Sequence, residues 1–137
     1  MAALVLAASL VCAQARAATV AAETFAGCYH LTLTRPLPAR SVEFFVELST
    51  MPSAEAHDAF VVRENRSSGF ARIFRHARWS MDNAHALAIL LSDGAESWSA
   101  ALRGPPGRMT GTAAYSGDGD APRRRWRALA TRYACRR

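Results

Sequence analysis

Two cysteines, Cys28 and Cys135, lie near opposite ends of the chain, and about seven or eight short segments of alternating apolar and polar residues lie between them. A two-residue alternation is typical of strands that bury one face. A disulfide between these cysteines would join the first strand to the last, which suits a small sheet closed on itself. We therefore predict an all-β fold: a small antiparallel up-and-down (meander) β-barrel of about 7–8 strands, its first and last strands joined by a disulfide.

The strand-like segments are separated by residues that break or turn the chain. Gly104 to Gly107 (GPPG) is a turn signal, and a polar loop is expected at residues 50–58. No stretch shows a helical period of any length. Strands are expected at residues 27–34, 42–49, 60–63, 70–79, 87–91, 96–102, 109–115 and 124–135.

The first residues are typical of an export signal. Residues 1–17 combine an apolar run with small residues around Arg16, although no basic residue precedes that run. Cys12 follows Val11, where a lipid-anchoring site would have a small residue, so anchoring at Cys12 is not expected. We predict a signal peptide at 1–17, a flexible segment at 18–26 and one barrel domain at 27–137. The even cysteine pair that remains favours a periplasmic or extracellular location.

The net charge of +6 comes from 17 basic residues, and all of them are arginine. Arginine without lysine, together with abundant alanine, is typical of a GC-rich genome. The main cluster is Arg123 to Arg125 with Arg127, interrupted by Trp126. We interpret it as a charged edge strand that discourages pairing with other chains. We expect no specific nucleic-acid partner, no stable membrane insertion and a monomeric protein.

Strand alternation predicts which side chains meet inside the barrel. If Tyr29 faces the core, Cys28 faces outward. An outward Cys135 then places Trp126 and Arg132 on the inner face of the last strand. We therefore expect Arg132 to lie over Tyr29, with its guanidinium bonded to strand-end carbonyls.

Gly27-Cys28-Tyr29 in the first strand and Arg132 in the last resemble the pattern of the calycins, the lipocalin-like and avidin-like barrels. In those families a Gly-x-Trp motif in the first strand packs beneath an arginine from the final strand. Tyr29 stands here in place of the tryptophan, and the chain is shorter than a typical lipocalin. The resemblance implies a barrel that binds one small apolar molecule in its interior.

Two functions remain open at this point. In the first, a non-enzymatic secreted barrel binds a small apolar ligand through inward side chains. Those candidate ligand-binding residues are Tyr29, Phe44, Trp98, Tyr115, Trp126 and Arg132. In the second, the same side chains fill the core, since an eight-stranded barrel is only just wide enough for them. The protein is then a structural or interaction module whose functional surface is the arginine-rich edge or the 50–58 loop.

Catalysis and metal binding are not expected. The four histidines, His30, His57, His76 and His85, show no metal-ligand spacing with one another, with cysteine or with a carboxylate. Asp118-Gly119-Asp120 lacks the closing glutamate of a calcium loop. We predict no enzyme activity, no cofactor and no metal site.

Overall fold

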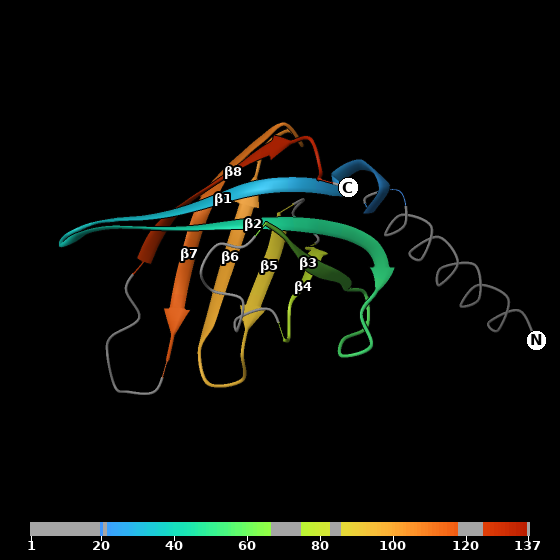
Figure 1. The fold of residues 1–137 in the computed structure, drawn as a ribbon, viewed down its shortest axis with the longest axis horizontal. Coiled ribbons are helices and arrows are strands. Elements are labelled where there is room, and N and C mark those ends of the chain that lie inside the picture. Colours follow the sequence, from blue (N-terminus) through green and yellow to red (C-terminus); the bar gives the residue numbers. More distant parts are fainter. Residues whose placement is uncertain (1–19, 21, 67–74, 83–85, 118–124, 137) are drawn as a thin grey trace, which may run out of the picture.

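Eight antiparallel strands form a closed barrel in the computed structural model, which describes residues 20, 22–66, 75–82, 86–117 and 125–136 (Figure 1). The predicted fold class is confirmed. The strands are β1 Gly27–Pro36, β2 Ala39–Pro52, β3 Phe60–Arg66, β4 Arg78–Met81, β5 Leu87–Ser92, β6 Ser97–Arg103, β7 Arg108–Ser116 and β8 Arg125–Tyr133.

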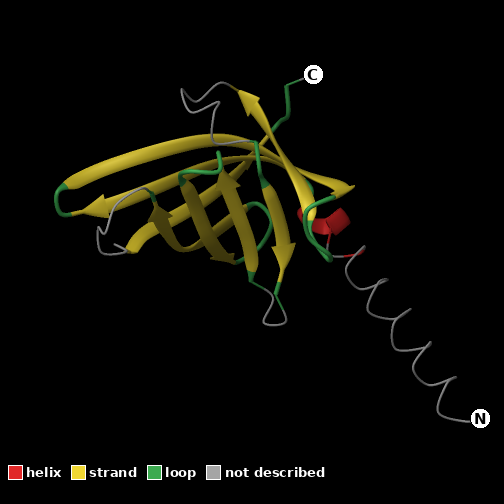
Figure 2. Cartoon of the chain, turned by 90° about the horizontal axis from the view of Figure 1, so that it is seen from below, coloured by secondary structure: helices red, strands yellow, loops and turns green. Residues whose placement is uncertain are grey.

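The barrel is a simple meander in which each strand pairs with the next and β8 pairs with β1. Figure 2, turned from the first view, shows the strands wrapped around one interior. The closing register places Arg132 opposite Tyr29 and Ala130 opposite Leu31. The predicted neighbourhood of Arg132 and Tyr29 is therefore confirmed.

Some strand boundaries differ from the expected ones. β2 begins at Ala39 and continues to Pro52, beyond the expected 42–49, because its ladder with β1 starts directly after a two-residue turn. Of the described residues in the strand expected at 70–79, only 78 and 79 belong to a strand, β4, which continues to Met81. Residues 70–74 lie outside the described part. β8 ends at Tyr133, so Cys135 follows the strand instead of belonging to it.

Alternate side chains along every strand point into one continuous apolar core. The alternation is clearest in β5 and β6, whose inward residues are buried between polar or small outward ones. The core includes Tyr29, Leu31, Leu33, Phe44, Val46, Leu48, Val62, Trp79, Leu87, Ile89, Leu91, Trp98, Ala100, Leu102, Met109, Trp126 and Ala130.

Within the N-terminal segment that we expected to be flexible, residues 22–25 form a helical turn. Ala22 is buried in the core cluster and Phe25 packs against it. The backbone N–H of Ala26 donates to the Ala22 carbonyl at 2.8 Å. This turn therefore covers the end of the barrel at which β1 begins.

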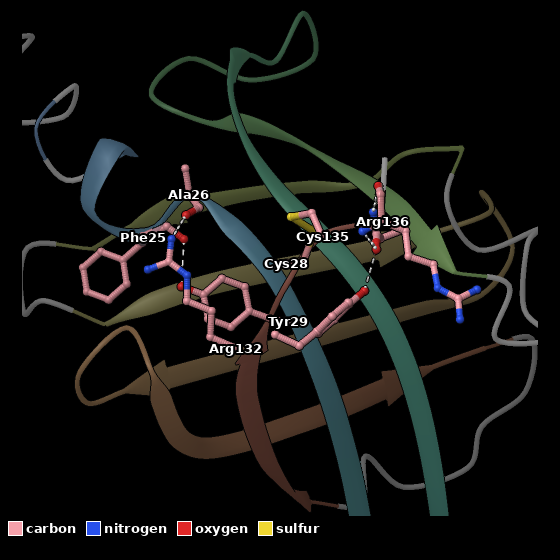
Figure 3. Close-up of a disulfide and its surroundings, with 9 residues drawn as sticks. Phe25, Ala26, Cys28, Tyr29, Arg132, Cys135 and Arg136 are labelled. Carbon is pink, nitrogen blue, oxygen red and sulfur yellow. Dashed lines mark hydrogen bonds between the residues drawn. A yellow bond between two sulfur atoms is a disulfide. The ribbon is translucent and has the colours of Figure 1, made fainter.

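The predicted disulfide joins Cys28, near the start of β1, to Cys135, two residues after β8 (Figure 3). The two Cα atoms are 5.2 Å apart and the residues are 107 apart in sequence. Cys28 lies opposite Tyr133, on the outer face of β1 as expected from the alternation. Its side chain nevertheless has no exposed surface. The disulfide therefore links β1 to the residues that follow β8, next to the β1–β8 pairing that closes the barrel.

Gly111 is the glycine whose replacement should disturb this sheet most directly. It lies on β7 between Leu102 of β6 and Ala128 of β8, and a Cβ there would collide with the Ala101 carbonyl. We expect Gly111→Ala to lower the free energy of unfolding by about 1–3 kcal/mol, since backbone must shift to admit the methyl group. Urea denaturation measures the change, and Gly107→Ala is the control because a Cβ there meets open space. Equal stability of the two variants would contradict the close β6–β7 approach.

Candidate functional site

Four of the predicted ligand-binding residues form one aromatic cluster inside the barrel. The Trp98 ring lies 4.9 Å from the Tyr115 ring, 4.9 Å from the Trp126 ring and 6.2 Å from the Phe44 ring, measured between centroids. The Arg35 guanidinium lies 5.1 Å from the Trp126 centroid, within cation–π range. The cluster therefore occupies the end of the barrel near the β1–β2 hairpin.

Tyr29 and Arg132, the other two predicted residues, lie at the opposite end of the barrel (Figure 3). The Arg132 guanidinium is 5.9 Å from the Tyr29 ring centroid and donates a hydrogen bond to the Ala26 carbonyl. The Tyr29 hydroxyl donates to the Phe25 carbonyl at 2.9 Å. Burial raises the pKa of the Tyr29 phenol, and the nearby Arg132 charge offsets part of that rise.

Arg132 makes the predicted contacts but stays solvent-exposed at the barrel rim. A Cβ on Gly27 would meet its guanidinium at 2.7 Å, so glycine at this position admits the arginine. The six predicted residues are thus divided between the two ends and do not form one site. Parity correctly predicted that the five aromatic residues face or pack against the core, whereas Arg132 is exposed at the rim. Parity could not predict how far apart the residues lie along the barrel axis.

Arg132→Ala should lower the free energy of unfolding by about 1–2 kcal/mol. The change removes one hydrogen bond and one exposed cation–π contact, each worth about 0.5–1.5 kcal/mol. The matched control is Arg127→Ala, because Arg127 is an exposed outward residue on the same strand and should change stability by less than about 0.5 kcal/mol. One urea-denaturation series measures both. Indistinguishable effects would show that the Tyr29–Arg132 contact contributes nothing to stability.

The inward side chains leave little space among themselves. Tyr29, Leu33, Phe44, Leu102 and Met109 have 0 % exposed surface, and Trp98 and Trp126 have 7 %. A side chain beside an internal void of water size would retain accessible surface. The interior around the five residues with no exposed surface is therefore filled by the protein's own side chains, and Trp98 and Trp126 retain a small accessible area.

A hollow lined by described residues lies on the outer face of β4 to β8 and has a volume of about 610 Å³. One row of paired residues crosses it from strand to strand: Arg78, Leu90, Ser99, Ala114 and Arg125. Four interstrand steps separate the two arginines, roughly 19 Å along the sheet. The hollow is therefore flanked by a cationic side chain on each side.

A second row of outward residues runs parallel to the first and is small throughout: Ser80, Ala88, Ala101 and Thr112. With so little side-chain volume above the sheet, another molecule could approach its backbone closely. Sequence reasoning missed this surface. Alternation can assign each of these residues to the outer face of its own strand only, because the alignment of the two rows depends on the register of five strands.

Sequence analysis proposed two functional surfaces, the arginine-rich edge and the 50–58 loop, and the structure describes the first of them only in part. Arg125 lies at one edge of the hollow and Arg127 is exposed beside Thr34, whereas Arg123 and Arg124 lie outside the described residues. The loop between β2 and β3 is held to the rest of the protein by Glu55. Its carboxylate lies 2.7 Å from His76 Nδ1 and 3.5 Å from Arg78 Nη1.

A further group of outward side chains connects strands near the β1–β8 pairing that closes the barrel. Sequence analysis did not predict this group. The His30 and Phe45 rings stack with centroids 4.6 Å apart, and the Arg66 guanidinium lies over the Phe45 and Tyr133 rings. The Tyr133 hydroxyl donates to Asn65 Oδ1 at 2.9 Å. These contacts connect β1, β2, β3 and β8, and we interpret them as structural.

Within the described ranges, no three side chains of the His, Cys, Asp and Glu types gather where they could share a metal ion. None of the described helical residues belongs to a helix long and apolar enough to cross a membrane.

Comparisons of the chain with protein-family models, curated proteins and solved structures found no match. The calycin resemblance therefore rests on the Gly27, Tyr29 and Arg132 arrangement and on the barrel itself.

Proposed function

We propose that the protein is an exported, non-enzymatic interaction module that binds its partner on the outer surface of a filled barrel. The supporting observation is the packing of the interior. Tyr29, Leu33, Phe44 and Met109 contact no space large enough for water, so an interior ligand would have to displace them. Of the two functions that the sequence left open, this observation favours the second.

Export is supported by the cysteine pair. A disulfide persists in an oxidising compartment and is rare in reducing ones. The Cys28–Cys135 bond closes the barrel wall between β1 and the chain after β8, so it belongs to the architecture of the fold. Together with the signal-like residues 1–17, it favours a periplasmic or extracellular location.

The hollow across β4 to β8 is the surface that we assign to this function. Its twelve lining residues include Arg78 and Arg125 and no acidic side chain, although the carboxylate of Glu55, which lies outside the hollow, is 3.5 Å from Arg78 Nη1. Arginine binds carboxylates through paired, charge-assisted hydrogen bonds. An acidic partner that replaces Glu55 at Arg78 and also binds Arg125 would use the whole hollow. Arg125 also belongs to the arginine-rich edge that the sequence indicated.

Native mass spectrometry of protein purified from its own host tests the interior. We expect the mass of the polypeptide alone, because a filled core leaves no room for a guest. Titration with dodecanoic acid should give no saturable change in tryptophan fluorescence, although Trp98 and Trp126 would report a ligand beside them. A co-purifying small molecule in one-to-one ratio would overturn the proposal in favour of interior binding.

Fluorescence anisotropy with a labelled hexaglutamate peptide tests the hollow. The double variant Arg78→Gln/Arg125→Gln should bind about tenfold more weakly than the native protein, since it loses charged hydrogen bonds to the peptide. The double variant Arg103→Gln/Arg108→Gln is the control, because both arginines are exposed, neither lines the hollow, and the same number of charges is removed. Equal weakening by both variants would show that net charge alone attracts the peptide.

A further inference from the structure

The tip of the β1–β2 hairpin presents apolar side chains to solvent. Leu37 is 82 % exposed, more than any other large hydrophobic residue in the described part of the chain. Its neighbours Pro36, Pro38 and Ala39 are exposed as well. A single exposed leucine needs no explanation, but a run of four apolar residues at one tip is a candidate contact surface.

This tip stands away from the barrel wall. Among the described residues, the β1–β8 ladder ends at Thr34 opposite Arg127, and the β2–β3 ladder begins at Phe45. The β1–β2 ladder nevertheless continues to the pair Pro36 and Ala39. In both Figure 1 and Figure 2 the hairpin extends beyond the ends of the neighbouring strands.

Arginines flank the apolar tip on both sides. Arg35 precedes it and Arg40 follows it, while the first acidic residue along β2 is Glu43. Arg35 Nε donates to the Pro38 carbonyl at 3.3 Å, a contact that braces the turn. Arg35 is half-buried, whereas Arg40 is exposed, and Arg127 adds a second exposed basic side chain beside Thr34 at the base of the hairpin.

We propose that the β1–β2 hairpin docks the protein on an anionic lipid surface, with Leu37 entering the interfacial region and the exposed Arg40 and Arg127 contacting headgroup phosphates. A bilayer surface is flat, so a protruding tip reaches it before the barrel wall does. Apolar residues in the acyl boundary flanked by basic residues at headgroup level are the arrangement that interfacial segments use. The overall charge of +6 adds attraction to such a surface.

Charge also favours lipid over a second copy of this chain. Two hairpin tips brought together would place Arg35 and Arg40 of one beside the same arginines of the other. A phosphate-rich surface instead supplies the opposite charge along the whole tip. This docking is independent of the acidic-partner proposal, because the hairpin and the hollow share no residue.

Vesicle co-sedimentation tests the docking. The native full chain is compared on vesicles of phosphatidylcholine alone and of equal parts phosphatidylcholine and phosphatidylglycerol. Binding should require the anionic lipid and weaken as salt is raised. Leu37→Ser should weaken it about tenfold, through lost apolar burial, and Arg40→Gln about fivefold, through one lost basic contact.

The chain offers matched controls at the opposite end of the barrel. Met51 is a 51 % exposed apolar residue near the end of β2, and Arg103 is exposed at the end of β6. Met51→Ser should leave vesicle binding unchanged, and Arg103→Gln should reduce it less than Arg40→Gln does. All variants carry the same N-terminal residues, so differences between them report on the substituted positions. Thermal melts by circular dichroism establish that each variant is folded.

Several results would overturn the docking. One is equal loss of binding in Leu37→Ser and Met51→Ser, and another is binding to phosphatidylcholine as strong as to the anionic vesicles. Glycerophosphate that competes fully at millimolar concentration would show a simple anion site instead of a membrane surface. Sedimentation velocity that finds a dimer dissociated by Leu37→Ser would assign the tip to self-association.

Discussion

Trp79→Ala is expected to lower the free energy of unfolding by about 3–5 kcal/mol, the usual cost of deleting a large aromatic side chain from a core. Trp79 lies on β4 with 1 % of its surface exposed, and its ring centroid is 5.0 Å from that of Phe60 on β3. Its indole N–H donates to the Ser49 carbonyl of β2 at 2.9 Å. One side chain therefore connects three consecutive strands.

The position of Trp79 explains why the loss should be large. In the described residues, the β3–β4 ladder consists of Phe60 opposite Trp79 and Val61 opposite Arg78. With so few backbone pairs between β3 and β4, packing by the indole should contribute more to the stability of this strand pairing than it would in a long ladder. Urea denaturation followed by circular dichroism measures the effect. Trp79→Phe separates packing from hydrogen bonding and should cost about 1–2 kcal/mol, and a Trp79→Ala loss below 1 kcal/mol would contradict the packing shown.

Replacing both Cys28 and Cys135 by alanine should lower the free energy of unfolding by about 2–5 kcal/mol. Removing a native disulfide from a small secreted domain has a cost of this size, since the unfolded chain regains the freedom of a long closed loop. The loop here spans 107 residues, nearly the whole barrel domain. Without the bond, the β1–β8 pairing would depend on hydrogen bonds and packing alone.

Denaturation with and without reductant checks this expectation. Reductant should destabilise the native protein by the same amount as the double substitution, provided that the thiols become accessible. It should leave the double variant unchanged, which separates loss of the bond from loss of the Cys28 side chain in its buried position. Two alkylatable thiols in native protein folded under oxidising conditions would disprove the disulfide.

Much of the fold was predictable because it depends on local periodicity. The two-residue alternation in β5 and β6 identified inward Leu87, Ile89, Trp98 and Leu102 directly, since a strand has only two faces. Trp79 could not be assigned in the same way. Apolar and basic residues fall on both faces of the segment 70–79, so the local pattern does not distinguish the faces. The carbonyl of Ser49, 30 residues away, decides where its indole lies.

The sequence alone determined the all-β class, the Cys28–Cys135 pair and the facing of Tyr29 and Arg132, because alternation and cysteine parity are properties of the chain itself. The tertiary structure decided what the residues do together. Strand register aligned Arg78, Leu90, Ser99, Ala114 and Arg125 in one row across the outer hollow. The length of each ladder left the apolar hairpin tip outside the wall, and the barrel's dimensions separated the predicted ligand residues. Register and ladder length depend on hydrogen bonds between strands distant in sequence, which no local pattern contains.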